Sequence, residues 1–304
     1  IKKAAEVLRR FESVVAVLPG NHDYIKPGDE NIWPMFEEHL GEGNVLLQAD
    51  KPQDLRPNLN GVIYPGVCKS KHSQENAIGW IAEEVDSASD AIRIGVAHGS
   101  LDGLSPDFNG DYFPMTHKEL EESGMHVWLL GHTHLRYPAQ ESGKEDRLFY
   151  PSVPEPDGFD CGHDGFAWII QVNSDGAVTY ESVQTGTYRF HRIDAELRNE
   201  DDINQLRGRF ESMRPESDLV KLNLTGRLAG DLYQSLGDLE REISDHVFHL
   251  EPVGRASVVR EIGELEINKE FTEGSFPHQL LMQLVSDDDV LALQLAYELM
   301  RETK

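Results

Sequence analysis

The stretch VVAVLPGNHD, residues 14–23, is a short apolar, β-branched run that stops at a Pro-Gly pair and continues into polar residues. Such a run predicts a strand buried on both faces, and the Pro-Gly pair predicts the loop that ends it. Upstream, apolar residues recur at helical spacing in residues 1–11. The predicted order is helix, buried strand, loop, and the loop carries Asn21, His22 and Asp23.

The same order occurs twice more along the chain. A helical pattern at residues 78–85 and an apolar run at residues 92–96 precede His98, and a helical pattern at residues 118–123 and an apolar run at residues 127–130 precede Gly131-His132-Thr133-His134. Helices that alternate with short apolar strands are typical of a layered α/β fold. We therefore expect an α/β domain whose strands are covered on both faces.

Downstream of residue 148 the pattern changes from alternating helices and strands to sheet. Strand-like runs separated by turn signals occupy residues 166–172, 177–183 and 188–193. The acidic stretch at residues 196–202 marks the predicted boundary between a domain of residues 1–197 and a smaller α+β domain of residues 198–304. In the second domain we expect helices at residues 203–213, 232–243 and 278–302, and strands at residues 219–224 and 247–250.

Composition restricts the classes of protein to which the chain can belong. Asp and Glu number 54 against 28 Lys and Arg, a net charge of −26, which argues against a wide basic surface for nucleic acid. No apolar stretch approaches the roughly 18 residues that span a bilayer. With only two cysteines and no leader pattern, we expect a cytoplasmic protein in a reducing compartment, whose natural start lies upstream of Ile1.

Three of the predicted strand-end loops carry side chains that bind metals. Ligands in open α/β sheets sit at the carboxyl ends of the strands, so these side chains are expected to converge: Asn21, His22 and Asp23 of the first loop, His98 of the second, and His132 and His134 of the third. Neutral imidazoles suit Zn, Cu, Fe or Ni, and an amide oxygen adds a harder ligand. Each loop alone also fits a polar residue satisfied in a turn, but their joint occurrence after three apolar strands favours a metal site.

Other features favour structural roles. Cys161 and His163 lack a second pair of ligands, so we interpret them as loop residues. His246 and His249 have no partner loop, and the four tryptophans lie in apolar contexts typical of a core. The basic cluster at residues 69–72 fits either a solvated loop or a contact to a substrate phosphate.

The order Gly-Asn-His-Asp, Ala-His-Gly, Gly-His-Thr-His resembles the calcineurin-like metallophosphoesterases. The segments LFYPSVPEPDGFD, GFAWIIQV and GTYRFHRIDAELR, within residues 148–198, resemble more narrowly the bacterial DNA-repair exonucleases of the SbcD and YhaO type. The resemblance implies an αββα sandwich followed by a C-terminal α+β capping domain.

The resemblance also implies roles for individual residues. Asn21, His98 and His132 would bind one divalent metal and His134 a second, with Mn expected and Fe, Zn or Mg as alternatives. His22 would not bind metal; it would act as the catalytic residue beside the scissile phosphate. Asp23 would orient His22 or cap the following turn.

The sequence departs from the family pattern in one respect. Members also carry an Asp-x-His and a Gly-Asp motif on two earlier strand ends, and residues 1–304 show neither in the corresponding place. We therefore expect that the N-terminal part with these motifs is missing and that this fragment is inactive. Asp102 and Asp107 are candidates for completing the site from within the chain.

These observations lead to one favoured function and two alternatives. The favoured function is metal-dependent phosphodiester hydrolysis by a DNA exonuclease or endonuclease in DNA repair. The alternatives are a small-molecule or nucleotide phosphoesterase of the same superfamily, and a non-catalytic module that binds DNA ends or a partner. Expected partners are DNA, an SMC-like ATPase subunit and a second copy of the chain, without a membrane.

Overall fold

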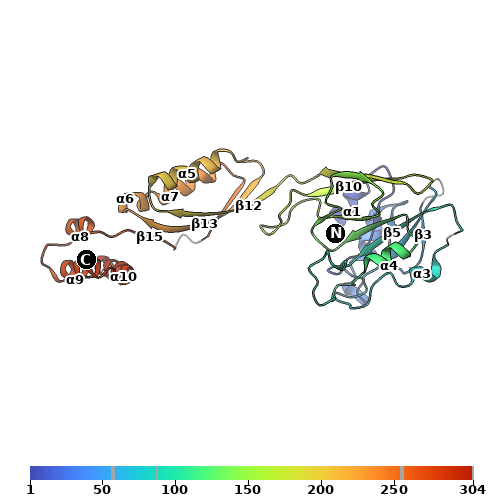
Figure 1. Cartoon of the computed structure of the whole chain (residues 1–304), viewed down its shortest axis with the longest axis horizontal. Coiled ribbons are helices and arrows are strands. Elements are labelled where there is room, and N and C mark those ends of the chain that lie inside the picture. The colour runs from blue at the N-terminus through green and yellow to red at the C-terminus, as the bar shows by residue number, and fades with distance from the viewer. Residues whose placement is uncertain (56–58, 87, 254–256, 303–304) are drawn as a thin grey trace. The chain divides into compact units, whose positions relative to one another are not determined.

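A computed structural model of the chain describes residues 1–55, 59–86, 88–253 and 257–302, without the side chain of Asp29. The chain forms two compact units. Unit 1 comprises Ile1–Glu155 and His163–Gly186, and unit 2 comprises Pro156–Gly162 and Thr187–Lys304. The described residues form a mixed α/β protein with several sheets, as predicted (Figure 1).

A six-stranded sheet with the order β3-β4-β5-β6-β9-β7 organises unit 1. Its members are β3 (Gln53–Asp54), β4 (Gly61–Gly66), β5 (Ile92–His98), β6 (Val127–Gly131), β9 (Leu148–Pro151) and β7 (Arg136–Tyr137). Strands β4, β5, β6 and β9 are parallel. The strands predicted at residues 92–96 and 127–130 are therefore neighbours, and their carboxyl ends lie at the same edge of the sheet.

Strand β6 shows how both faces of this sheet are covered. Trp128 and Leu130 pack in a core cluster with residues of α3 (Ile81–Glu84) and α4 (His117–Glu122). Val127 packs in a second cluster with β10 (Phe166–Val172) and β11 (Val178–Gln184). The alternation places helices on one face and a second sheet on the other.

The second sheet of unit 1 has the order β10-β11-β8, with β8 at Ser142–Lys144, and all its pairs are antiparallel. The strands predicted at residues 166–172 and 177–183 are confirmed, the latter shifted by one residue. Gly176, at φ +79°, closes the turn between them, in a conformation that favours glycine.

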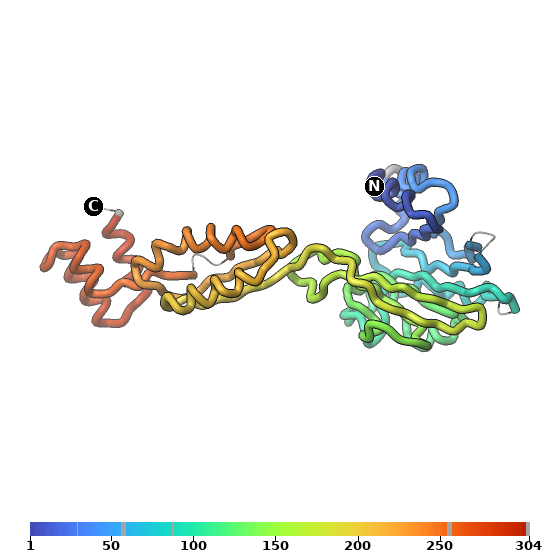
Figure 2. The backbone as a smooth tube through the Cα atoms, turned by 90° about the horizontal axis from the view of Figure 1, so that it is seen from above, coloured from blue at the N-terminus to red at the C-terminus, as the bar shows by residue number. Residues whose placement is uncertain are grey.

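The N-terminal part of unit 1 has a small core of its own. It contains α1 (Lys2–Leu8), η1 (Gly28–Glu30), α2 (Trp33–Leu40) and the parallel pair β1 (Ala16–Val17) and β2 (Val45–Leu46). Trp33, Phe36 and Leu40 of α2 pack against Ala5 of α1, and Figure 2 shows this blue segment gathered beside the cyan and green strands. The prediction of a fully buried strand at residues 14–18 is wrong. Only two residues pair, and Ala16 is exposed, because β1 has β2 as its one partner among the described strands.

Unit 2 contains a four-stranded sheet, joined by three parallel pairings, with two helices packed on one face. Its strands are β12 (Arg189–Leu197), β13 (Asp218–Leu228), β14 (His249–Val253) and β15 (Val258–Arg260). Strand β13 pairs in parallel with the other three. Helices α5 (Glu200–Glu211) and α7 (Leu236–Ser244) pack on one face, and α6 (Gly230–Gln234) precedes α7 (Figure 1).

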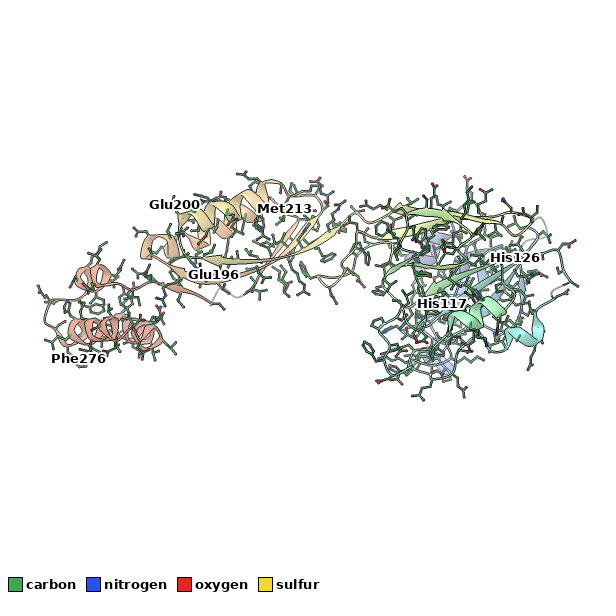
Figure 3. The ribbon with its side chains drawn as sticks, in the orientation of Figure 1. His117, His126, Glu196, Glu200, Met213 and Phe276 are labelled. Carbon is green, nitrogen blue, oxygen red and sulfur yellow. The ribbon has the colours of Figure 1, made fainter. Side chains whose placement is uncertain are left out.

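The acidic stretch at residues 196–202 is the end of β12 and the first turn of α5. The Asn199 side chain caps the helix by accepting the Asp202 N–H, and acidic residues suit the positive end of the helix dipole. Figure 3 labels Glu200 in this turn and Met213 beyond the other end of α5. The boundary at residues 197/198 stays a prediction about domains. The compact units separate at residues 186/187 because β12 pairs with β13.

Three helices complete unit 2: α8 (Glu264–Glu270), α9 (Phe276–Ser286) and α10 (Val290–Glu302). They share a small core that includes Ile267, Leu281 and Tyr297. The helical stretch predicted at residues 278–302 is two helices separated at residues 287–289. Among the described residues, no helix has the length and apolarity required to cross a membrane.

Candidate metal centre

The predicted ligands of unit 1 lie where the two central parallel strands end. His98 is the last residue of β5, and its register partner Gly131 is the last residue of β6. His132 follows directly, so the rings of His98 and His132 are neighbours, with centroids 5.4 Å apart. The structure thus brings together two histidines that are separated by 33 intervening residues in the sequence.

Asn21 joins these histidines from the loop after β1. Its side chain is buried, and its Oδ1 lies 2.9 Å from Nε2 of His98. Its amide nitrogen donates to the carbonyl oxygen of Lys71 at 3.4 Å, which turns Oδ1 toward the ring. Two ligand atoms at right angles, each about 2.1 Å from an ion, are about 3 Å apart, so this pair fits one metal ion.

Two glycines leave space for the His98 ring. A Cβ placed on Gly20 would lie 2.8 Å from Cε1 of His98, and one placed on Gly131 would lie 2.9 Å from its Nδ1. Both distances are shorter than side-chain contacts allow. The glycines of the Gly-Asn-His-Asp and Gly-His-Thr-His motifs therefore form a cradle for His98, which the motif pattern alone did not reveal. We call Gly20 and Gly131 the glycine cradle.

The surroundings keep the central histidines uncharged. Burial, together with the nearby His132, His22 and His134, lowers the pKa of His98 to about 4. Burial also lowers the pKa of His132; Asp107 opposes this shift, while His134 and His22 add to it. Neutral imidazoles carry the lone pairs that metal binding requires, so the donor set of two ring nitrogens and an amide oxygen fits a divalent transition metal.

His22 and His134 are exposed residues beside this pair. Both lower the pKa values of His98 and His132, which places them within electrostatic range of these two half-buried rings. Asp23 accepts the N–H of Gly20 through Oδ1 at 2.7 Å. This contact closes the turn that precedes Asp23, whereas the roles expected for Asp23, to orient His22 or to cap the following turn, stay predictions.

The loop after β5 supports His132 from the side. The centroid of the Tyr112 ring lies 4.8 Å from that of His132. The His72 ring also contacts Tyr112, with the two centroids 5.0 Å apart. His132 has a φ of +102°, which a residue with a side chain rarely adopts. Sequence reasoning did not single out Tyr112, because its partner ring is 20 positions away.

The carboxylate of Asp107 is engaged by hydrogen bonds within this loop. It accepts Ser100 Oγ at 2.7 Å and the backbone N–H groups of Asp111 and Tyr112 at 3.0 Å each. Burial opposes ionisation, but these hydrogen bonds outweigh it and lower the pKa of Asp107. Both carboxylate oxygens therefore serve the loop, and Asp102 is exposed on it.

The other sequence candidates have structural partners. Cys161 Sγ donates to Asp157 at 3.0 Å, and Nδ1 of His163 accepts the Gly165 N–H at 3.1 Å. His246 is half-buried and His249 exposed. Trp33 and Trp128 are core residues, Trp80 and Trp168 are half-buried, and all four indole N–H groups donate to backbone oxygens.

The basic cluster at residues 69–72 borders the centre. Lys69 pairs with Asp50, the Lys71 carbonyl holds Asn21, and His72 contacts Tyr112. His117 and His126, labelled in Figure 3, belong to other parts of unit 1, and Nδ1 of His126 accepts the Arg93 N–H at 2.9 Å.

An apolar cavity of about 600 Å³ opens beside the centre. It lies between the six-stranded sheet and β10, and it reaches His98 and Gly131. Ile94, Val96 and Leu129 on one side and Trp168 on the other are only half-buried around it. Apolar side chains that gather in this way normally pack against another helix or strand.

A layered α/β unit with Asn and His side chains gathered beyond strand ends is the arrangement expected of a metal-dependent hydrolase. The chain is a distant homologue of the uncharacterized metallophosphoesterase YhaO of Bacillus subtilis (strain 168), with 28% identity over 184 residues. This homology supports the calcineurin-like metallophosphoesterase family. The match covers 60% of this chain and 42% of the relative, so the chain corresponds to less than half of that protein. No family model matches the sequence.

Proposed function

We propose that the chain carries part of the active centre of a two-metal phosphodiesterase that cleaves DNA in repair. The observation that carries the proposal is the contact of Asn21 with His98 next to His132, beside His22 and His134. The distant homology to a metallophosphoesterase supports the reaction class. The substrate, DNA, is our proposal and rests on the narrower resemblance of residues 148–198.

The proposed mechanism divides the work among five side chains. Asn21, His98 and His132 would hold one divalent ion and His134 a second, with Mn expected and Fe, Zn or Mg as alternatives. Bound metals would activate a water molecule and neutralise the phosphoryl oxygens. His22, which is exposed at the loop tip, would donate a proton to the departing oxygen.

We also propose that further metal ligands come from a segment outside residues 1–304. Two observations support this. The carboxylates of Asp23 and Asp107 are engaged by backbone N–H groups of their own loops. An apolar cavity of about 600 Å³, lined by half-buried side chains such as Val96 and Leu129, reaches His98. Residues 1–304 alone are then expected to bind metal weakly and to be nearly inactive.

Hydrolysis of bis-p-nitrophenyl phosphate with Mn²⁺ tests the reaction class. A longer protein that also carries the proposed segment should turn over this diester and stop when a chelator is added. Equal turnover with and without chelator would remove metals from the mechanism. Two tight Mn²⁺ sites in residues 1–304, measured by calorimetry, would contradict the proposal of missing ligands.

A substitution tests the role of His22. His22→Ala should lower kcat by ~10² or more while metal affinity stays close to that of the unmodified protein. His249→Ala, at an exposed histidine of unit 2, is the matched control and should leave both quantities unchanged. Loss of metal in His22→Ala would instead make His22 a ligand.

The domain of residues 198–304 is proposed to act as a cap that selects which diesters reach the centre. Its acidic surface supports this, because acidic residues repel a phosphate backbone and leave binding to local contacts. Its deletion from the longer protein should spare hydrolysis of the small diester and reduce digestion of DNA ends. An SMC-like ATPase subunit and a second copy of the chain are the proposed partners.

Two other functions keep specific support. The net charge of −26 favours a small-molecule or nucleotide phosphoesterase, which needs no extended contact with a polyanion. The small set of ligands within residues 1–304 favours a non-catalytic DNA-end or partner-binding module. Turnover of mononucleotide diesters without DNA cleavage would indicate the first, and absence of turnover by the longer protein would indicate the second.

A further inference from the structure

Phe108 is the most exposed large apolar side chain of the described chain, at 97% of its full accessible area. It lies in the loop that follows His98 and returns to the sheet edge, where Leu101 and Met115 form a bridge. A phenylalanine with this exposure contributes little to the core, because burial is the source of its stabilising effect. What distinguishes Phe108 from the other exposed apolar side chains is the loop that carries it.

The loop holds Phe108 in a defined place. The preceding residue, Asp107, accepts three hydrogen bonds, from Ser100 Oγ and from the N–H groups of Asp111 and Tyr112, at 2.7–3.0 Å. The two ends of the loop are also joined, since Ser100 N donates to the carbonyl of Tyr112 at 2.8 Å. Asp107, directly before Phe108, and Asp111 and Tyr112, three and four residues after it, are thus joined by short hydrogen bonds.

The same loop contacts the candidate metal centre. The Tyr112 ring contacts the His132 ring at a tilt of 32°, with centroids 4.8 Å apart, and Ser100 is two residues from His98. The loop that carries Phe108 therefore begins next to one predicted ligand, His98, and at Tyr112 contacts another, His132. A substrate whose phosphate lies at the centre would extend past this rim.

We propose that Phe108 is a specificity residue that stacks on an unpaired base of a nucleic-acid substrate. The inference deepens the proposed function and rests on it. An acidic chain gains little from backbone phosphates, whereas the face of a base is uncharged and stacks on aromatic side chains whatever the sequence. Because every base has such a face, the contact selects single strands or frayed ends over small diesters.

The test uses a short phosphorothioate-linked oligothymidylate that contains one 2-aminopurine, whose fluorescence falls when its base stacks. Residues 1–304 are titrated with it in the presence of Mn²⁺. Phe108→Ala should weaken binding about tenfold and remove the additional quenching, while Phe108→Trp should retain both. Phe11→Ala removes another exposed phenylalanine of unit 1 and is the matched control, expected to bind like the unmodified chain.

The outcomes separate the inference from the proposed function. Equal binding by Phe108→Ala and the unmodified chain, or no binding by either, overturns the stacking role of Phe108. Hydrolysis of bis-p-nitrophenyl phosphate by the longer protein is measured in parallel and decides the proposed reaction independently. Phe108→Ala in that protein should leave the small diester reaction unchanged and raise KM for the oligonucleotide.

Discussion

Gly20→Ala is the substitution that most directly tests the arrangement of the metal centre. The added Cβ would lie 2.8 Å from Cε1, 3.0 Å from Nδ1 and 3.1 Å from Nε2 of His98. Ordinary contact begins at 3.4 Å, so the ring must retreat by about 0.6 Å. Gly131 also lies against this ring, since a Cβ placed on it would lie 2.9 Å from Nδ1 of His98.

The expected loss follows from what this displacement breaks. Nε2 of His98 lies 2.9 Å from Oδ1 of Asn21, and a shift of this size separates two atoms that we assign to one ion. Changes that misorient a metal ligand cost about 10- to 100-fold in metal affinity. Gly20 has no positive φ, so alanine fits its backbone and the fold should persist.

Calorimetric titration with Mn²⁺ measures the effect, and far-UV circular dichroism confirms that the variant is folded. Gly208→Ala is the control, because nothing lies within 4 Å of its added Cβ inside helix α5. That variant should keep its Mn²⁺ affinity and gain about 0.5–1 kcal/mol of stability. Unchanged Mn²⁺ affinity in folded Gly20→Ala would refute the assignment of His98 as a ligand held by the glycine cradle.

Three further predictions concern stability. Gly95→Ala should destabilise unit 1 by about 1–3 kcal/mol in chemical denaturation, because the new Cβ would lie 2.2 Å from the buried Trp128 ring; an unchanged midpoint would contradict this packing. Burial opposes ionisation of Asp218, but hydrogen bonds and charge from Arg214, with help from His191, outweigh it and lower the pKa of Asp218. The resulting stability is present at neutral pH and should be lost as the pH falls through the lowered pKa, more steeply than in Asp218→Asn, as thermal melts between pH 7 and pH 2 would show. Mn²⁺ at 100 times its dissociation constant should stabilise the chain by about 2.7 kcal/mol, and a chelator should reverse the shift in melting temperature.

The central strands could be predicted from the sequence because their apolar runs end in abrupt polar loops. The expected run at residues 92–96 is β5, extended to His98, and the run at residues 127–130 is β6, extended to Gly131. Strand β5 thus ends on the candidate ligand His98, and β6 ends one residue before the candidate ligand His132. Hydrophobic pattern therefore locates the strand, while backbone pairing decides where it ends.

The strand expected at residues 14–18 shows what pattern cannot supply. Its five apolar residues predict burial on both faces, yet two residues pair and Ala16 is exposed. Burial requires neighbours on both sides, and the described chain provides β2 alone. Sequence periodicity reports what a segment can bury, not which partner is present to cover it.

The candidate site was predictable as a set of residue types and not as a geometry. The spacing of Asn21, His98 and His132 after three strands indicated convergence, and the structure brings these three together. The glycine cradle, the Tyr112 contact and the Lys71 carbonyl were not foreseen, because each depends on a distance between segments far apart in the sequence.

The contact between Asn21 and His98 joins residues 77 positions apart, and the glycine cradle adds a third segment a further 33 positions along. Contacts of such long sequence separation form late, since the chain must close large loops before they contribute. The centre is thus assembled near the end of the folding of unit 1. Mn²⁺ added during refolding should therefore bind only in the last kinetic phase. The rate of Mn²⁺ binding would then measure how fast the sheet is completed.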